Sequence, residues 1–248
     1  MEDEYLPEPS ETVRADHGRP YDAVLLDLFG TLVDFHSVFT ETLELILVDN
    51  QLDKVREGFR DRWRRFVFQG QSQGAFVTVR EDFERSLVAV LRELGREGDL
   101  AGYARRVIGQ MFDRLKEAEL YPEVPKALAA IEAEGFPWAI VSNVDEAELQ
   151  AIISNQGLMP GAAVSSERVR SYKPDRAIFQ AALDELDLVP SRAVHAGDSP
   201  LADVSGASGA GLSALWVNRH GREFPLDLPR PRWELPDLSQ LPALLLED

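Results

Sequence analysis

Several polar side chains of this sequence stand directly after apolar runs, where buried strands would end. The first is Asp27, which follows the apolar run 23–26 and precedes a glycine turn at Gly30 and Thr31. Ligands of open α/β sheets gather at the carboxyl ends of such strands. A carboxylate there can attack phosphorus or carbon and form an ester that water later hydrolyses. We therefore expect Asp27 to be a catalytic nucleophile.

Three further groups of polar residues lie at the end of a predicted strand or in the loop after it. They are Ser142 with Asn143, Lys173, and Asp198 with Asp203. Phosphoryl transfer requires neutralisation of charge on the phosphoryl oxygens, which a magnesium ion, a lysine and hydroxyl donors supply together. In that chemistry Lys173 is the cationic clamp, and Thr31 and Ser142 donate hydrogen bonds to the phosphate. The sequence uses arginine far more than lysine, so a lysine at 173 suggests a need for a compact ammonium group.

The acidic residues could hold a divalent cation. Mg²⁺ prefers oxygen ligands in an octahedron and retains several waters, so two carboxylates and one backbone carbonyl suffice. Asp198 fits a direct ligand beside Asp27. Asp203 either binds the ion or orients a metal-bound water.

Each of these residues also has a simpler interpretation. Ser142 and Asn143 could only cap the helix that follows them, and Asp198 and Asp203 could be a loop acid and a helix cap. His195 lies within a strand pattern and is expected to be packed rather than catalytic. Asp145 either contacts substrate or favours the positive end of a helix. The combination of all the groups, in this order, favours the catalytic interpretation.

Alternating strands and helices must position these residues. Strand-like apolar runs occupy residues 23–28, 137–142, 193–196 and 213–217, with weaker candidates at 162–165 and 232–235. Helical patterns at residues 146–157 and 176–188 lie between them. Such alternation predicts βαβ units with a parallel sheet.

Residues 35–120 show a different pattern, with amphipathic helices and no convincing strand. The expected helices span residues 38–48, 53–68, 80–94 and 101–115, each with apolar residues near the i, i+3, i+4, i+7 spacing. We expect an all-helical cap that covers Asp27, excludes water and adds substrate contacts. Its second helix is locally basic, either as a solvated face or because an arginine there binds an anionic substrate group. The basic residues are Lys54, Arg56, Arg60, Arg62, Arg64 and Arg65.

Composition restricts the possible functions. The chain has 248 residues, no cysteine and a formal net charge of −17. This charge opposes binding to nucleic acid and anionic membranes and favours a small-molecule partner. Residues 1–20 are acidic, contain prolines and lack the features of a secretory signal, so we expect a disordered tail and a cytoplasmic protein. No apolar run approaches the roughly 20 residues that span a bilayer.

In order and surroundings, the four polar groups resemble the motifs of the haloacid dehalogenase (HAD) superfamily of hydrolases. The matching segments are LLDLFGTLVD, AIVSNVD, VRSYKPDRAIF and HAGDSPLADVSGASGAG. The resemblance covers nearly the whole chain after Tyr21. It implies an α/β fold with a Rossmann-like three-layer core, a parallel sheet and an inserted all-helical C1-type cap. The expected core comprises residues 21–34 and 121–248, and the expected cap residues 35–120.

Phe29 departs from the pattern of phosphatases in this superfamily. They place an aspartate two residues after the nucleophile, where it protonates the leaving group, and a phenyl ring cannot transfer a proton. General acid or base catalysis is typically worth roughly 10²- to 10⁴-fold, so substrates with good leaving groups should suffer least. The family binds its metal through the backbone carbonyl at this position, so Phe29 is still an expected metal ligand.

Dehalogenases of the superfamily also lack that aspartate and carry an aromatic residue in its place, because halide leaves without protonation. Segments 172–174 and 216–219 resemble them as well. Asp198 argues the other way, since similar metal-independent dehalogenases usually have serine there. An acid facing Asp27 would be costly without a cation between the two. The acidic pair therefore favours magnesium, and magnesium favours phosphate.

From the sequence we thus expect a Mg²⁺-dependent phosphatase that acts on a small phosphorylated metabolite through an aspartyl-phosphate on Asp27. One alternative is a 2-haloacid dehalogenase with the same nucleophile. Another is a phosphometabolite-binding protein of low activity. The predicted site comprises catalytic Asp27 and Lys173, substrate-binding Thr31, Ser142 and Asn143, and metal ligands Asp27, Phe29, Asp198 and Asp203.

Overall fold

A six-stranded parallel sheet forms the centre of the molecule. The computed structural model describes residues 19–72 and 75–247, so all but the last two residues of the expected 1–20 tail lie outside the described part. The strand order is β3-β2-β1-β4-β5-β6, and each neighbouring pair is parallel. The strands are β1 (Ala23–Leu26), β2 (Trp138–Ser142), β3 (Ala162–Ser165), β4 (Ala193–Gly197), β5 (Ser213–Val217) and β6 (Trp233–Leu235).

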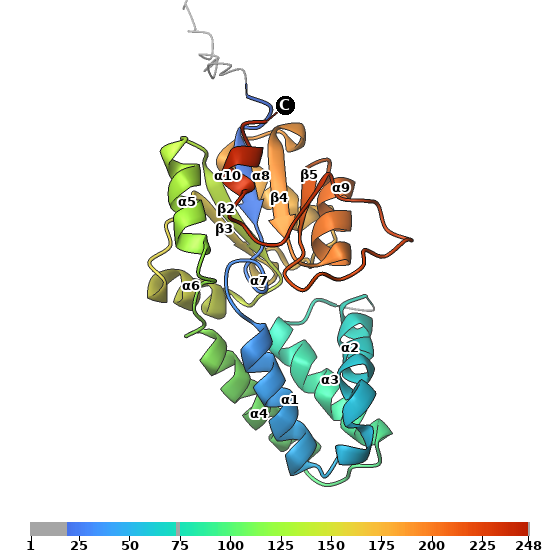
Figure 1. The fold of residues 1–248 in the computed structure, drawn as a ribbon. Helices are drawn as coiled ribbons and strands as arrows, with labels where there is room; N and C mark the ends of the chain where they lie inside the picture. The colour runs from blue at the N-terminus through green and yellow to red at the C-terminus, as the bar shows by residue number, and fades with distance from the viewer. Residues whose placement is uncertain (1–18, 73–74, 248) are drawn as a thin grey trace, which may run out of the picture.

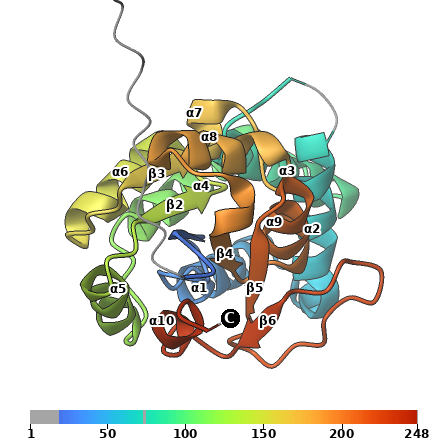
Figure 2. The same ribbon diagram turned by 90° about the horizontal axis from the view of Figure 1, so that it is seen from above.

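Helices cover both faces of the sheet, which gives three layers (Figure 2). Apolar residues of α5 (Val124–Ala133), α6 (Glu146–Asn155) and α10 (Leu241–Leu244) join one hydrophobic cluster with the sheet. Those of α8 (Arg176–Leu186) and α9 (Gly206–Ala210) join a second cluster. The short helix α7 (Ser166–Val169) follows β3. These layers and the parallel sheet confirm the predicted Rossmann-like α/β fold.

The strand order explains where polar residues converge. Strand β1 lies between β2 and β4, and the order of the chain reverses at the β1–β4 junction. Ligands of doubly wound sheets bind at such a switch point, outside the carboxyl ends of the strands. Asp27, Asn143 and Asp198 follow these three central strands directly.

Four helices between β1 and α5 form a separate hydrophobic cluster (Figure 1). They are α1 (His36–Asp49), α2 (Arg56–Ser72), α3 (Val79–Glu93) and α4 (Leu100–Leu115). We call α1–α4, with the described segments that connect them, the cap, and the remaining described residues the core. The two connections lie side by side, because Val33 and Leu120 form an antiparallel bridge. The exact division into 21–34, 35–120 and 121–248 stays a prediction that this separate packing supports.

Some elements differ from the sequence-based expectation. The helix expected at residues 53–68 begins with a 3₁₀ turn at Asp53–Val55, and its regular part starts only after Gly58, whose φ of +86° favours glycine. Helix α5 was not expected; its proline lies in the first turn, where a missing N–H leaves no bond broken. Among the described residues, none of the helices has both the length and the apolar character to cross a membrane.

Candidate active site

Asp27 lies at the centre of a buried hydrogen-bond network. It is 5% exposed, and its backbone N–H still donates to Ala196 of β4 at 3.0 Å. The hydroxyl of Thr31 donates to Oδ2 of Asp27 at 3.2 Å, and the hydroxyl of Ser142 donates to Oδ1 at 3.0 Å. Burial raises the pKa of Asp27, which the Lys173 ammonium opposes. The network therefore combines a desolvated carboxylate with donors that hold its orientation.

Lys173 joins Asp27 to a second acid, Asp203. Its Nζ donates to Oδ1 of Asp27 at 2.6 Å, to Oδ1 of Asp203 at 2.6 Å and to the carbonyl of Val141 at 2.9 Å. An ammonium group has three protons, so all of them are used. Burial alone would lower the pKa of Lys173, but the carboxylates of Asp203 and Asp27 raise it. The expectation of a compact cation at this position agrees with the contacts.

Asp203 is held on both of its oxygens. Oδ1 accepts from Lys173 and from Nε2 of His195 at 2.9 Å, and Oδ2 accepts from the backbone N–H of Ser199 at 2.8 Å. Burial raises the pKa of Asp203, but Lys173 and His195 outweigh it and hold the pKa well below its usual range. Gly197 is required here, because a Cβ at that position would lie 2.2 Å from Cγ of Asp203.

His195 supports Asp203 from inside the core. Its ring is fully buried and meets the ring of Phe179 edge-on at 5.0 Å. Burial lowers the pKa of His195, so we assign a neutral ring that donates from Nε2. The sequence predicted a packed histidine and did not predict its bond to Asp203, which depends on the turn after β4.

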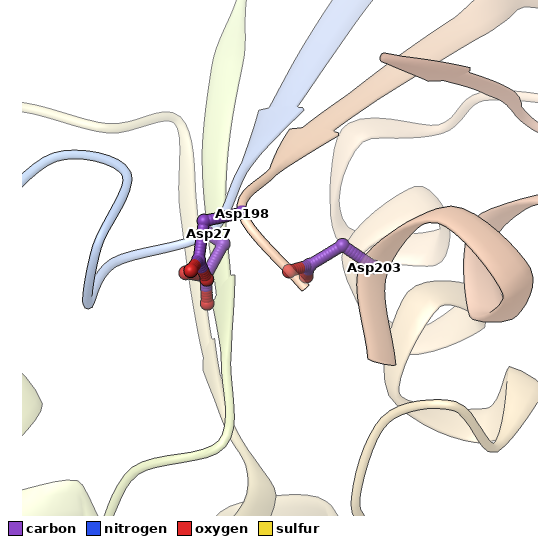
Figure 3. Close-up of side chains that lie close together, drawn as sticks. All are labelled: Asp27, Asp198 and Asp203. Atoms are coloured by element: carbon purple, nitrogen blue, oxygen red, sulfur yellow. The ribbon is translucent and has the colours of Figure 1, made fainter. Parts of the chain in front are cut away.

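Asp198 completes a group of three carboxylates. Figure 3 shows the carboxylate of Asp203 pointing toward those of Asp27 and Asp198, and one oxygen from each lies within 4.8 Å of the others. Burial, with the charges of Asp203 and Asp27, raises the pKa of Asp198 to about 7. The turn after β1 passes close by: a Cβ on Gly30 would lie 2.9 Å from Cγ of Asp198.

The three carboxylates have the chemistry of a hard-cation site. When all are ionised they carry three negative charges against the buried ammonium of Lys173 and the exposed guanidinium of Arg222, which lies 3.4 Å from Oδ2 of Asp198. A proton or a cation beside Asp198 would relieve the remaining repulsion. Asp27 and Asp198 would hold the ion. Asp203 would either bind the ion directly or orient a metal-bound water. The magnesium site, including the Phe29 carbonyl, stays a prediction.

Asn143 forms its side-chain hydrogen bonds with Lys173 rather than with Asp27. The backbone N–H of Lys173 donates to Oδ1 of Asn143 at 2.7 Å, and Nδ2 of Asn143 donates to the carbonyl of Lys173 at 3.2 Å. This two-way bond fixes the main chain that carries the ammonium group. The predicted role of Asn143 in substrate binding is untested.

A chain of aromatic side chains connects the loop after β1 to the cap. The ring of Phe29 lies 5.6 Å from that of Phe35, which stacks on Phe39 at 5.2 Å. The guanidinium of Arg60, on α2, lies 5.6 Å from the centre of the Phe39 ring. Helical spacing alone did not indicate which cap arginine approaches this chain. A hollow along α2 is lined by cap residues and by none of the three carboxylates around Lys173; its lining is Gly58, Asp61, Arg62, Arg64 and Arg65.

Comparison with known proteins identifies the family. Residues 21–211 match the family described as haloacid dehalogenase-like hydrolase. The (S)-2-haloacid dehalogenase H-109 of Pseudomonas putida is 26% identical over 92% of this chain and 100% of its own length. The (S)-2-haloacid dehalogenase of Pseudomonas sp. strain YL is 28% identical over 89% of this chain and 93% of its own.

Solved structures agree on the fold. The L-2-haloacid dehalogenase of Xanthobacter autotrophicus is 22% identical, with a TM-score of 0.73 over 91% of this chain and 98% of its own. YfnB of Bacillus subtilis, solved bound to magnesium, is 21% identical, with a TM-score of 0.73 over 92% of this chain and 99% of its own.

These relatives correct the function predicted from the sequence. The expectation of a Mg²⁺-dependent phosphatase was wrong, because relatives that match nearly the whole chain are 2-haloacid dehalogenases. The error came from giving the acid at Asp198 more weight than the aromatic residue at Phe29. The match over residues 21–211 establishes that this chain belongs to the haloacid dehalogenase-like hydrolases.

Proposed function

We propose that this protein is an (S)-2-haloacid dehalogenase in which Asp27 is the nucleophile. One observation carries the proposal: the carboxylate of Asp27 is oriented by hydrogen bonds from Thr31 and Ser142, and the residue two positions later, Phe29, has an aromatic ring. Such a site has a nucleophile and no proton donor two residues later. Halide leaves without a proton, so this combination suits carbon–halogen cleavage. The named activity of the relatives supports the same chemistry.

In the first step, a carboxylate oxygen of Asp27 attacks C2 of the haloacid. The new C–O bond forms as the carbon–halogen bond breaks and halide departs with the bonding electrons. Oδ2 is the better placed oxygen, because it accepts only from Thr31, whereas Oδ1 accepts from both Ser142 and Lys173. Displacement at the face opposite the halogen inverts C2, so an (S) substrate gives an (R)-2-hydroxy acid.

In the second step, water attacks Cγ of Asp27 and hydrolyses the ester. Negative charge then develops on the carbonyl oxygen, which is Oδ1 if Oδ2 formed the ester. Lys173 and Ser142 already donate to Oδ1, at 2.6 and 3.0 Å. Preorganised donors at such an oxygen commonly supply a large part of the rate enhancement. Collapse of the intermediate restores the Asp27 carboxylate and releases the 2-hydroxy acid, with one proton of the water passing to the departing alkoxide oxygen and the other to solvent.

The substrate carboxylate requires a cationic partner, and Arg60 is the cap residue we assign to it. Arg56 is paired with Glu44 and Asp53, and Arg62 is paired with Glu93. Arg60 instead lies over Phe39, at the end of the aromatic chain that starts at Phe29. A guanidinium there can bind a carboxylate through two parallel hydrogen bonds. The substrate is thus a small organic anion.

The experiment is halide release from (S)- and (R)-2-chloropropionate. We expect chloride release from the (S) isomer and loss of at least a thousandfold in Asp27→Asn. Asp184→Asn, on the surface of α8, is the control and should keep full activity. A single turnover in ¹⁸O-water should place the label in Asp27, because water attacks the carboxyl carbon of the ester.

Other results would refute the proposal. Label that enters the product alone would mean that water attacks C2 directly. Chloride release that survives in Asp27→Asn would exclude the nucleophile. Activity should also survive EDTA, since halide departure needs no metal; activity restored only by Mg²⁺ would instead assign the carboxylate group an obligatory cation.

A further inference from the structure

Arg219 holds the turn that connects the nucleophile to the cap. It lies two residues after β5, and its side chain is only 10% exposed. Nε donates to the carbonyl of Gly30 at 3.1 Å, and an Nη2 proton donates to the carbonyl of Thr31 at 2.6 Å. Thr31 is the residue whose hydroxyl donates to Asp27. One guanidinium therefore fixes two consecutive peptide groups, on either side of the Thr31 Cα.

The same guanidinium contacts the return connection from the cap. It lies 3.7 Å from the centre of the Tyr121 ring, and Nη2 also pairs with Glu123 at 2.6 Å. The backbone N–H of Tyr121 donates to the carbonyl of Leu32 at 2.9 Å, next to the Val33–Leu120 bridge. Arg219 thus joins the segment that leads from the core into the cap to the segment that leads back from the cap to the core.

We propose that Arg219 is a positioning residue that sets the nucleophile loop, residues 27–34, against the return connection, residues 119–123. It does not touch the reacting atoms. It acts through the carbonyls of Gly30 and Thr31, and hence on the hydroxyl bond from Thr31 to Asp27. The catalytic part of this proposal rests on the proposed dehalogenase function, whereas the structural part does not.

An arginine suits this task for a physical reason. Its planar fork presents several donors in fixed directions, and its flat face stacks on an aromatic ring. The two carbonyls, Glu123 and the Tyr121 ring use these features together. Lysine keeps the charge but loses the fork and the stacking. Methionine keeps most of the length and loses all donors.

The test uses Arg219→Met and Arg219→Lys, with Arg192→Met as the matched control. Arg192 and Asp22 directly precede β4 and β1, at the end of the sheet away from Asp27. Nε and Nη2 of Arg192 donate to the two carboxylate oxygens of Asp22, at 2.9 and 2.7 Å. The first readout is hydrogen exchange of the full-length protein without substrate. In Arg219→Met we expect at least tenfold faster exchange over residues 28–34 and 119–123, and in Arg192→Met no change there.

The second readout is steady-state kinetics with (S)-2-chloropropionate, in which kcat and KM are determined separately. We expect Arg219→Met to lower kcat tenfold to a hundredfold and to change KM by less than threefold, since a displacement near 1 Å can cost about 100-fold. Arg219→Lys should fall between Arg219→Met and the wild type in both readouts. If Arg219→Met does not fold, Arg219→Lys provides the test on its own.

Two results would overturn the proposal: unchanged exchange over both segments in the Arg219 variants, or a general rise in exchange that Arg192→Met shares. A kcat within twofold of wild type would reject the catalytic part. If the wild type releases no chloride, the proposed function fails, but the exchange comparison still decides whether Arg219 holds the two segments.

Discussion

The carboxylate of Asp145, in the core, accepts the backbone N–H of Val79 in the cap at 2.6 Å. Its second oxygen accepts the N–H of Arg80 at 3.0 Å, so a core residue caps the first turn of α3. The Arg80 guanidinium pairs with Glu148 at 2.6 Å, and the hydroxyl of Tyr172 donates to the carbonyl of Val77. The cap is therefore fastened to the loops that carry Asn143 and Lys173.

Asp145→Ala should weaken this junction. Two helix N–H groups would lose their acceptor, and an unsatisfied buried group costs about 1–3 kcal/mol. Urea denaturation measures the loss, and kcat/KM for the haloacid should fall as well. Asp99→Ala is the control, because Asp99 caps α4 within the cap itself by accepting from Gly102 at 2.9 Å. A fall in kcat/KM of equal size in Asp99→Ala would contradict a role at the junction.

Lys173→Met should lower both stability and activity. It leaves Asp27 and Asp203 buried without their shared cation, and breaking a buried ion pair typically costs about 3–5 kcal/mol. Activity should fall at least a hundredfold, measured as chloride release. Lys126→Met, at an exposed position of α5, should shift stability by no more than about 0.5 kcal/mol. Equal stability losses in the two variants would show that the buried lysine has no special contribution.

Asp198→Asn should change how stability depends on pH. The pKa of Asp198 is about 7 in the folded protein and 3.8 ordinarily, so the folded state keeps a proton that the unfolded state releases between these values. In the wild type, the stability that protonated Asp198 contributes is therefore present below pH 4. It is lost as the pH rises to 7, where the folded protein must ionise this buried acid. Asp198→Asn should match the wild type near pH 4 and have the higher Tm at pH 8.

A divalent cation would change the difference in Tm between the wild type and Asp198→Asn at pH 8. Mg²⁺ between Asp27 and Asp198 would replace the proton and stabilise the ionised acid, so 10 mM MgCl₂ should raise the wild-type Tm at pH 8 and leave that of Asp198→Asn nearly unchanged. An equal response of both proteins to MgCl₂ would argue against a site at Asp198. A Tm difference that stays constant from pH 4 to 8 would contradict the raised pKa.

Arg60→Ala should raise KM for 2-chloropropionate tenfold or more, because the substrate carboxylate would lose its guanidinium partner. Arg62→Ala is the matched control on the same helix, and its pairing with Glu93 predicts a KM close to wild type. Arg60→Lys should recover part of the affinity. Steady-state kinetics decide the matter, and a KM unchanged in Arg60→Ala would assign the substrate carboxylate to another residue.

The sequence predicted best those features that depend on short stretches of chain. The run 23–26 is completely buried in β1, as a strand covered on both faces should be. Because parallel strands end at one edge, the order of Asp27, Ser142, Lys173 and Asp198 was enough to predict that they meet. Lys173 and Ser142 do contact Asp27.

Features that join distant segments were not predictable from the sequence. Asp145 precedes a helix of its own, and nothing in the local pattern indicates that it caps α3 of the cap. Arg219 lies 189 positions from Gly30 along the chain, yet its side chain holds that turn. The kink at Gly58 depends on a positive φ that an amphipathic pattern does not reveal. The prediction of the substrate was wrong for a related reason. Phe29 and Asp198 indicate different chemistry, and one sequence without a relative for comparison does not show which of them decides.

The third acceptor of Lys173 is the main-chain carbonyl of Val141. No change of side chain at position 141 can remove that acceptor, because every residue type carries the same carbonyl group. The ammonium therefore keeps one fixed anchor in β2 even when Asp27 or Asp203 is replaced. Inactive aspartate variants should for this reason retain the native fold and be suitable for crystallising the enzyme with intact substrate.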